Sequence, residues 1–233
     1  MFDALFTTTT EYKKLSHALS GKGACALFGL PASGRAQMYA ALCRQLDKPL
    51  CIVTPGEAEA TRFAADLNTL GIPAAVFPAR DYVLRPIEGT AREYEYRRLA
   101  VLGELVGGRL RAVAVPAEAL TQFTTPKEDF CANTRTLHAG DTLLRDDLLA
   151  ALFGAGYTRR AQVDGPGQFS VRGDIVDIFA PDQKMPVRME FWGDEIDTLH
   201  TFDLTTQRRE DAIDKFYLSP AREVLFGKPA DAA

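Results

Sequence analysis

The stretch closest to catalytic chemistry is G-L-P-A-S-G-R-A, at residues 29–36. A phosphate-binding loop has the form G-x-x-x-x-G-K-[ST] and lies between a buried strand and a helix. Gly29 and Gly34 have the required spacing. Arg35, however, replaces the lysine that contacts phosphate, and Ala36 replaces the hydroxyl that holds magnesium. The pattern predicts a degenerate phosphate loop without working phosphate chemistry.

Three interpretations of this loop are open. A working nucleotidase is disfavoured, because no apolar run ends in the paired acids of a metal-holding strand and residues 112–115 lead into Pro116. A second interpretation is a chance strand–glycine–helix turn. The third is a relic that keeps the fold and has lost hydrolysis. We favour the relic, since the spacing and the expected context survive and only the chemical residues differ.

The second candidate for function is the run V-R-M-E-F-W at residues 187–192. Successive side chains of a strand point to opposite faces, so the apolar odd positions predict a core face. The even positions, Arg188, Glu190 and Trp192, are then expected on an exposed face. A tryptophan beside an arginine on such a face resembles the anchors of protein–protein interfaces. The alternative is a cation–π pair with a purely structural role.

Other chemistry-bearing residues form no convincing site. The histidines, at positions 17, 138 and 200, are far apart in the sequence and lack metal or nucleophile companions. The cysteines, at positions 25, 43, 51 and 131, form no C-x-x-C pair and predict buried, reduced thiols. We therefore expect neither a metal site nor a cofactor.

The elements that must position these residues differ between the two halves of the chain. In the first half, short apolar runs alternate with helical patterns, which indicates an α/β fold with a parallel sheet. Strands are expected at residues 24–29, 50–54, 74–77 and 112–115. Helices are expected at residues 11–20, 34–46, 57–70, 91–103 and 116–123.

The second half has the pattern of a small α+β domain. Asp141 and Thr142 are expected to cap a helix that stops at residues 154–156. Residues 168–203 read as short antiparallel strands. The apolar parity changes within this stretch, and a bulge at or near Gly173 would reconcile the two parts. The pattern weakens around residues 124–129, so the expected domains are 1–126, 127–214 and a return segment, 215–233.

Composition limits the functional classes. The 233 residues are 46% hydrophobic and 25% charged, which is typical of a globular protein. The net charge of −4 disfavours DNA binding by this chain alone, because phosphate contacts dominate such binding. No run approaches the ~20 apolar residues that span a bilayer, and the N-terminus lacks a signal-peptide pattern. We expect a soluble, cytoplasmic protein.

Three blocks carry a family resemblance: G-P-G-Q-F-S-V-R-G-D-I-V-D-I-F at 165–179, P-V-R-M-E-F-W-G-D-E-I-D at 186–197 and F-D-L-T-T-Q-R at 202–208. Together they resemble the N-terminal module of the bacterial transcription-repair coupling factors (Mfd) and, less closely, the excision-repair protein UvrB. F-P-A-R-D, R-R-L-A-V-L and L-S-P-A-R-E extend the resemblance over most of the chain. UvrB keeps an intact phosphate loop, so the altered loop favours the coupling factors.

The resemblance implies a UvrB-like, helicase-type α/β domain with an inserted α+β domain that docks UvrA, the damage-recognition ATPase of nucleotide excision repair. By position in the family's motifs, the implied contact residues are Arg172, Arg188 and Trp192. No catalysis is expected of this chain. Coupling factors are longer and engage RNA polymerase and double-stranded DNA through other domains, so we expect an N-terminal fragment or a truncated relative. The alternative is a UvrB-like, ATP-dependent repair enzyme domain that binds nucleotide or DNA.

Overall fold

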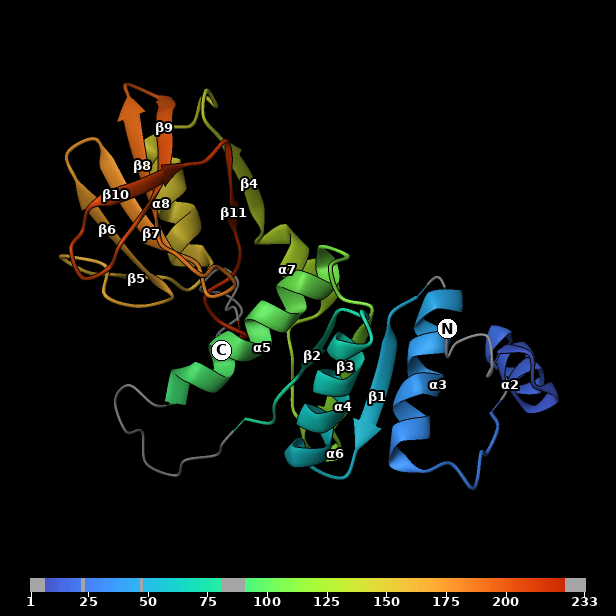
Figure 1. Ribbon diagram of the computed structural model, residues 1–233. Coiled ribbons are helices and arrows are strands. Elements are labelled where there is room, and N and C mark those ends of the chain that lie inside the picture. Colours follow the sequence, from blue (N-terminus) through green and yellow to red (C-terminus); the bar gives the residue numbers. More distant parts are fainter. Residues whose placement is uncertain (1–6, 22–23, 47, 81–90, 225–233) are drawn as a thin grey trace. The chain divides into compact units, whose positions relative to one another are not determined.

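The computed structural model of the protein describes residues 7–21, 24–46, 48–80 and 91–224 (Figure 1). The chain divides into two compact units. The first consists of residues 1–79 and 107–122, and the second of residues 80–106 and 123–233.

The first unit is built on a parallel sheet of three strands in the order β1-β3-β2. The strands are β1 (Leu50–Thr54), β2 (Ala74–Val76) and β3 (Ala112–Pro116), and the helices are α2 (Thr10–Ser20), α3 (Ala32–Gln45), α4 (Glu57–Thr69) and α6 (Ala117–Leu120). The central strand, β3, is buried at all five positions. The predicted parallel α/β arrangement is confirmed.

Helix α4 shows why this sequence forms a sheet-covering helix. Its buried residues are Ala60, Phe63, Ala64 and Leu67, which recur at the spacing of one helical face. They pack in one core cluster with Ile52 of β1. The helical period of the sequence therefore fixes the face that α4 turns toward the sheet.

The strand expected at residues 24–29 is absent, and this prediction was wrong. These residues form no regular element and are exposed; the side chain of Phe28 is 88% accessible. An apolar run becomes a strand only when a neighbouring strand satisfies its backbone groups. In the structure, β1 pairs with β3, and no strand in the described part of the chain pairs with this run.

The second unit contains a six-stranded sheet in the order β10-β9-β8-β7-β6-β5 and the two-stranded sheet β11-β4. Its helices are α5 (Ala91–Val106), α7 (Lys127–Ala132) and α8 (Arg145–Gly154). Its strands are β4 (Arg135–His138), β5 (Thr158–Arg159), β6 (Gln168–Arg172), β7 (Ile175–Phe179), β8 (Val187–Trp192), β9 (Glu195–Phe202), β10 (Arg209–Ala212) and β11 (Lys215–Leu218). The β5–β6 pair is parallel and the other pairs are antiparallel. The antiparallel strands expected within residues 168–203 are confirmed as β6 to β9.

The core of this unit lies on one face of the six-stranded sheet, against α8 (Figure 1). Leu148 and Leu152 of α8 are completely buried, and they share a cluster with Phe169, Ile178 and Met189 of the sheet. The apolar odd positions of β8 are all buried, as strand alternation predicted. One face of the sheet is therefore used for folding.

The bulge expected near Gly173 is not present. β6 and β7 form a regular hairpin in which Val171 pairs with Val176 and Arg172 with Ile175. The connection is a two-residue turn that begins with Gly173, whose φ is +60°. A glycine with positive φ at the first turn position is typical of a type II′ hairpin turn. Because a two-residue turn pairs odd with even positions, the change of parity needs no bulge.

The expected cap of α8 was also wrong. The helix begins at Arg145, its N-cap residue is Leu144, and no side chain caps it. Asp141 instead accepts a hydrogen bond of 2.8 Å from the backbone N–H of His138. The predicted end is confirmed, because the helix stops at Gly154 and Gly156 has a φ of +85°.

Three further observations bear on function. Cys43 is buried, whereas Cys25, Cys51 and Cys131 are exposed, so the prediction of buried thiols holds only for Cys43. No helix in the described part of the chain has the length and apolar character needed to span a bilayer. Within the same residues, no group of three His, Cys, Asp or Glu side chains is placed to hold a metal ion.

Candidate functional site

The second face of the six-stranded sheet carries the residues that the sequence singled out. Strand pairing aligns one residue from each of β6, β7, β8 and β9 in a row across the sheet: Ser170, Asp177, Arg188 and His200. The next row toward the hairpin turns consists of Arg172, Ile175, Glu190 and Thr198. We call the face that bears these two rows and Trp192 the polar face.

Among the described residues of this unit, Trp192 is the most exposed aromatic residue. It follows Glu190 by two positions on β8 and directly precedes the turn that starts at Gly193. Its side chain is 82% accessible, so the predicted exposure is confirmed. Burial of a large apolar ring is favourable, and an isolated tryptophan in water therefore offers a partner considerable apolar area.

Arg188 is not on an exposed surface, and that expectation was wrong. Only 9% of the residue is accessible. Its Nε donates to Oδ1 of Asp177 at 2.7 Å, and its Nη2 donates to Oδ2 of the same carboxylate at 3.0 Å. Its Nη1 donates to the carbonyl of Gln207 at 3.2 Å. All three nitrogens of the guanidinium group are thus engaged inside the unit.

The loop after β9 covers Arg188, and local chemistry explains its shape. Asp203 Oδ1 accepts hydrogen bonds from the backbone N–H groups of Thr205 and Thr206, which closes a tight turn. Hydrogen bonds from Thr206 lower the pKa of Asp203 below its ordinary value, and the hydrogen bond from Thr205 makes a smaller contribution in the same direction. Gln207 follows with a φ of +59° and presents its carbonyl to Arg188. Strand alternation alone could not reveal this cover.

The aromatic ring of Phe202 lies beside the guanidinium group of Arg188. The guanidinium carbon of Arg188 lies 4.7 Å from the centroid of the Phe202 ring, within cation–π range. Phe202 also belongs to a small cluster with Val163, Phe179 and Leu204. The alternative interpretation, a structural cation–π pair between Arg188 and Trp192, was therefore wrong, because the aromatic partner of Arg188 is Phe202.

Asp177 is the residue of the candidate site that sequence reasoning missed. Its side chain is completely buried, and it accepts hydrogen bonds from Arg188 and from Arg172, whose Nη2 lies 2.6 Å from Oδ2. Arg172 itself remains 46% exposed. The available signal was an acid within the apolar run of 175–179, since a buried charge requires a partner.

Two more half-exposed arginines flank these residues. Arg209 of β10 pairs with Glu190, and Arg145 at the start of α8 donates to the carbonyl of Gly173 at 2.8 Å. The arginine side chains are 46% and 42% accessible, respectively. The polar face and its edge therefore combine an exposed tryptophan with several guanidinium groups that acids or carbonyls of the unit hold in place.

The phosphate-loop residues of the first unit do not form a comparable site. Gly29 lies in an irregular segment with a φ of +84°, whereas Gly34 and Ala36 are buried within α3, which begins at Ala32. Nη1 of Arg35 lies 3.6 Å from Oε1 of Glu59, and the guanidinium carbon of Arg35 lies 5.9 Å from the centroid of the Phe63 ring. The helix thus starts before the second glycine, and no strand precedes the first one.

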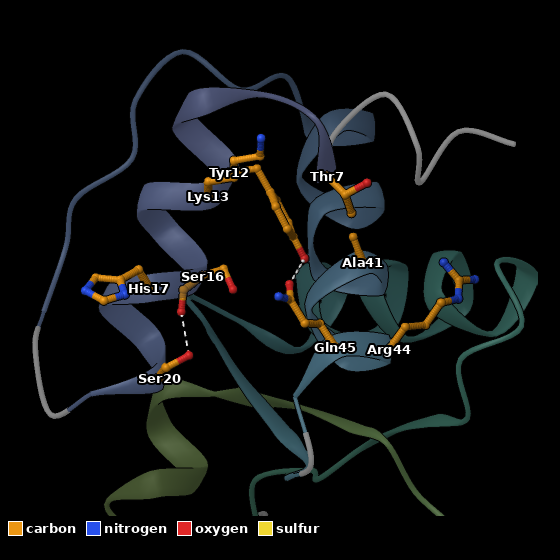
Figure 2. A pocket seen from close by; sticks show the side chains of 9 residues that line it. All are labelled: Thr7, Tyr12, Lys13, Ser16, His17, Ser20, Ala41, Arg44 and Gln45. Atoms are coloured by element: carbon orange, nitrogen blue, oxygen red, sulfur yellow. Dashed lines mark hydrogen bonds between the residues drawn. The ribbon is translucent and has the colours of Figure 1, made fainter.

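Figure 2 shows a pocket of the first unit, a hollow of about 500 Å³ between α2 and α3. Tyr12 crosses it and donates a hydrogen bond of 2.9 Å to Gln45. Its basic residues do not converge, because Arg44 donates to the carbonyl of Leu70 and His17 lies at the far side of the pocket (Figure 2). We therefore place the candidate site on the polar face.

Comparisons with known proteins match the part of the chain that contains the polar face. Residues 136–224, which include α8 and the whole six-stranded sheet, match the family described as "UvrB interaction domain". The residues of the polar face thus lie in the part of the chain that is similar to UvrB interaction domains.

The comparisons also show which longer proteins contain such a chain. It is 28% identical over 209 residues to the transcription-repair-coupling factor of Bacillus subtilis (89% of this chain, 18% of the relative). It is 35% identical over 208 residues to the transcription-repair-coupling factor of Myxococcus xanthus (84% of this chain, 17% of the relative). It is 38% identical over 192 residues to that of Mycobacterium tuberculosis (79% of this chain, 15% of the relative). The resemblance to transcription-repair coupling factors is confirmed over most of the chain, which spans less than a fifth of these relatives' length.

Proposed function

We propose that this chain is the protein-interaction module of a transcription-repair coupling factor and that it recruits UvrA in nucleotide excision repair. The observation that carries the proposal is the 82% exposed Trp192 on the same sheet face as Arg172, within the UvrB interaction domain. The chain itself performs no catalysis. Contacts with RNA polymerase and double-stranded DNA belong to other parts of the longer protein, which works in the cytoplasm.

The chemistry of the polar face supports a protein partner. Trp192 fills an apolar hollow of UvrA, as aromatic anchors do at interface centres. Arg172 makes charge-assisted hydrogen bonds to carboxylates of UvrA, because nearly half of its side chain remains accessible beside Asp177. Arg188 takes part through its bonds inside the unit, since only 9% of it is accessible.

The first unit serves as scaffold in this proposal. The spacing of Gly29 and Gly34 supports descent from a UvrB-like, helicase-type phosphate loop, and the pairing of Arg35 with Glu59 gives that arginine a structural role. The division at residues 1–126, 127–214 and 215–233 stays a prediction about where the UvrA-binding domain is inserted.

Titration of the chain with UvrA tests the proposal. Trp192→Ala should weaken binding by at least tenfold, equivalent to about 1.4 kcal/mol or more, because a hot-spot anchor is lost. Phe123→Ala is the matched control, since Phe123 is also an exposed aromatic residue but lies outside the six-stranded sheet. Equal affinities for the wild type and Trp192→Ala would refute the assignment of this face.

A second pair of variants tests the charged contact. Arg172→Ala should reduce the affinity for UvrA by roughly tenfold, because an interfacial carboxylate loses its partner. Arg159→Ala should leave it unchanged, since Arg159 pairs with the core-facing Phe169 and so lies on the other face of the sheet. Equal losses for the two variants would indicate a general charge effect.

The alternative function, an ATP-dependent repair enzyme, makes a different prediction. Calorimetric titration with ATP and magnesium should give no binding, and incubation should give no hydrolysis, because Arg35 and Ala36 lack the phosphate-loop chemistry. Binding that Arg35→Ala abolishes, together with turnover, would favour the enzyme.

A further inference from the structure

The strongest unassigned feature of the polar face is Asp177, a completely buried carboxylate between two arginines. We propose that Asp177 is a positioning residue of the docking face: Arg188 clamps it, and it in turn fixes the exposed guanidinium group of Arg172. The proposal rests on the proposed docking function. It makes Arg188 an indirect contributor to binding and adds Asp177 to the residues that docking requires.

The first step of the argument is the direction of the Arg188 donors. Nε and Nη2 form a fork on both oxygens of Asp177, and Nη1 donates to the carbonyl of Gln207. A planar guanidinium group that uses two N–H groups on one carboxylate fixes the orientation of that carboxylate. The plane of the Asp177 carboxylate is therefore set from β8.

The second step concerns Arg172. The β6–β7 register places Ser170, and not Arg172, opposite Asp177, so Arg172 reaches the carboxylate along the diagonal. Its Nη2 lies 2.6 Å from Oδ2, the same oxygen that Arg188 Nη2 approaches at 3.0 Å. Fixing the carboxylate consequently fixes the hydrogen bond that holds the Arg172 guanidinium group.

The third step is the charge that remains. Two guanidinium groups surround one carboxylate, which leaves one positive charge, and Arg172 is the accessible member. A long side chain that is already ordered loses less conformational entropy on binding than a mobile one. The arrangement thus presents a preorganised cation to a carboxylate of the partner, two strands away from Trp192.

The rival explanation is that Asp177 only neutralises the buried Arg188 and that its contact with Arg172 has no effect on docking. The two explanations differ in coupling. If Asp177 acts through Arg172, its replacement must lose its effect once Arg172 is gone. If Asp177 is only structural, its replacement must weaken binding equally in both backgrounds.

A double-mutant cycle in the full chain measures this coupling. Asp177→Asn should weaken UvrA binding about tenfold in the wild-type background and less than about twofold in the Arg172→Ala background. Equal fold losses in the two backgrounds would overturn the positioning role. If Trp192→Ala weakens binding but Asp177→Asn gives equal losses in both backgrounds, the positioning role is wrong and the docking function still holds. Unchanged binding in Trp192→Ala would remove the docking function itself.

A second measurement uses the wild-type chain alone, so it does not depend on whether Asp177→Asn folds. Relaxation of the ¹⁵Nε signals of arginine reports how freely each guanidinium group moves on the ps–ns timescale. Arg172 should be clearly more restricted than the exposed Arg159 of β5, although nearly half of its side chain is accessible. If Arg172 moves as freely as Arg159, the positioning proposal is wrong, whatever the stability of Asp177→Asn.

Discussion

Arg35 in the first unit and Arg188 in the second are the same residue type in opposite circumstances. The Arg35 side chain is 43% exposed and approaches one acid, Glu59, at 3.6 Å. The Arg188 side chain is 10% exposed and forms a fork on a completely buried carboxylate at 2.7 and 3.0 Å. Arg35 belongs to the motif with the stronger sequence signature, whereas Arg188 belongs to the better-constructed site. A motif thus indicates a function only where the surrounding elements support it.

The sheets of the two units explain this difference. The first unit has three paired strands, and the apolar run at residues 24–29 is not one of them. The main sheet of the second unit has six, and its uninterrupted pairing from β6 to β8 brings Arg172, Asp177 and Arg188 together from three strands. A row of aligned strands can hold side chains in fixed mutual positions, which a single loop before a helix cannot do alone.

Replacement of the two arginines by alanine should give the largest contrast. Arg188→Ala should destabilise the second unit by about 3–5 kcal/mol, because it strands the buried carboxylate of Asp177. Arg35→Ala should cost at most about 1 kcal/mol, since its ion pair is screened by solvent. Urea denaturation with peptide-resolved hydrogen exchange would assign each loss to its unit. Similar losses for the two variants would remove the contrast.

Two glycines allow a finer comparison. Gly167 has a φ of +71°, and a Cβ there would lie 2.6 Å from the hydroxyl oxygen of Tyr96, whereas Gly29 has a φ of +84° with open space around it. Gly167→Ala should therefore destabilise its unit by roughly 2–3 kcal/mol, through strain and a clash together. Gly29→Ala carries only the backbone strain, about 1 kcal/mol. Thermal unfolding followed by circular dichroism would rank the pair, and the reverse order would contradict the structure.

Phe28 tests the strand that the sequence predicted and the structure lacks. Because this side chain is 88% exposed, Phe28→Ser should change the free energy of unfolding by no more than about 0.5 kcal/mol. In a buried strand, the loss of the ring would cost about 3–5 kcal/mol. Chemical denaturation distinguishes these two values, and a loss in the larger range would show that residues 24–29 form a buried strand after all.

The smallest effect concerns the loop that covers Arg188. Hydrogen bonds from Thr206 and Thr205 lower the pKa of Asp203 from its ordinary value of 3.8, so they stabilise the folded loop above that pH. The stabilisation is lost as the pH falls through the lowered pKa of the folded state. Hydrogen exchange at the amides of Thr205 and Thr206 should therefore lose protection at acid pH. In Asp203→Asn, whose side-chain oxygen still accepts hydrogen bonds but does not titrate, protection should be insensitive to this change.

Most of the paired elements could be predicted from the sequence, because their signals are local. The helical period of α4 and the two-residue period of β8 each identify a buried face within one element. For the same reason the exposure of Trp192 follows from its neighbours. Exceptions arose where a second segment decides the outcome, as at residues 24–29, with which no strand among the described residues pairs.

The amino-acid sequence by itself determined the period of each element, the family resemblance and the presence of Arg35 and Ala36 where a working phosphate loop has Lys and Ser or Thr. Only the tertiary structure decided that Arg188 is enclosed, because the loop that covers it begins 15 residues later, at Asp203, and reaches it through the carbonyl of Gln207. Likewise, only strand register placed Asp177 between two arginines. Burial and charge pairing depend on which segments meet, and no local pattern contains that information.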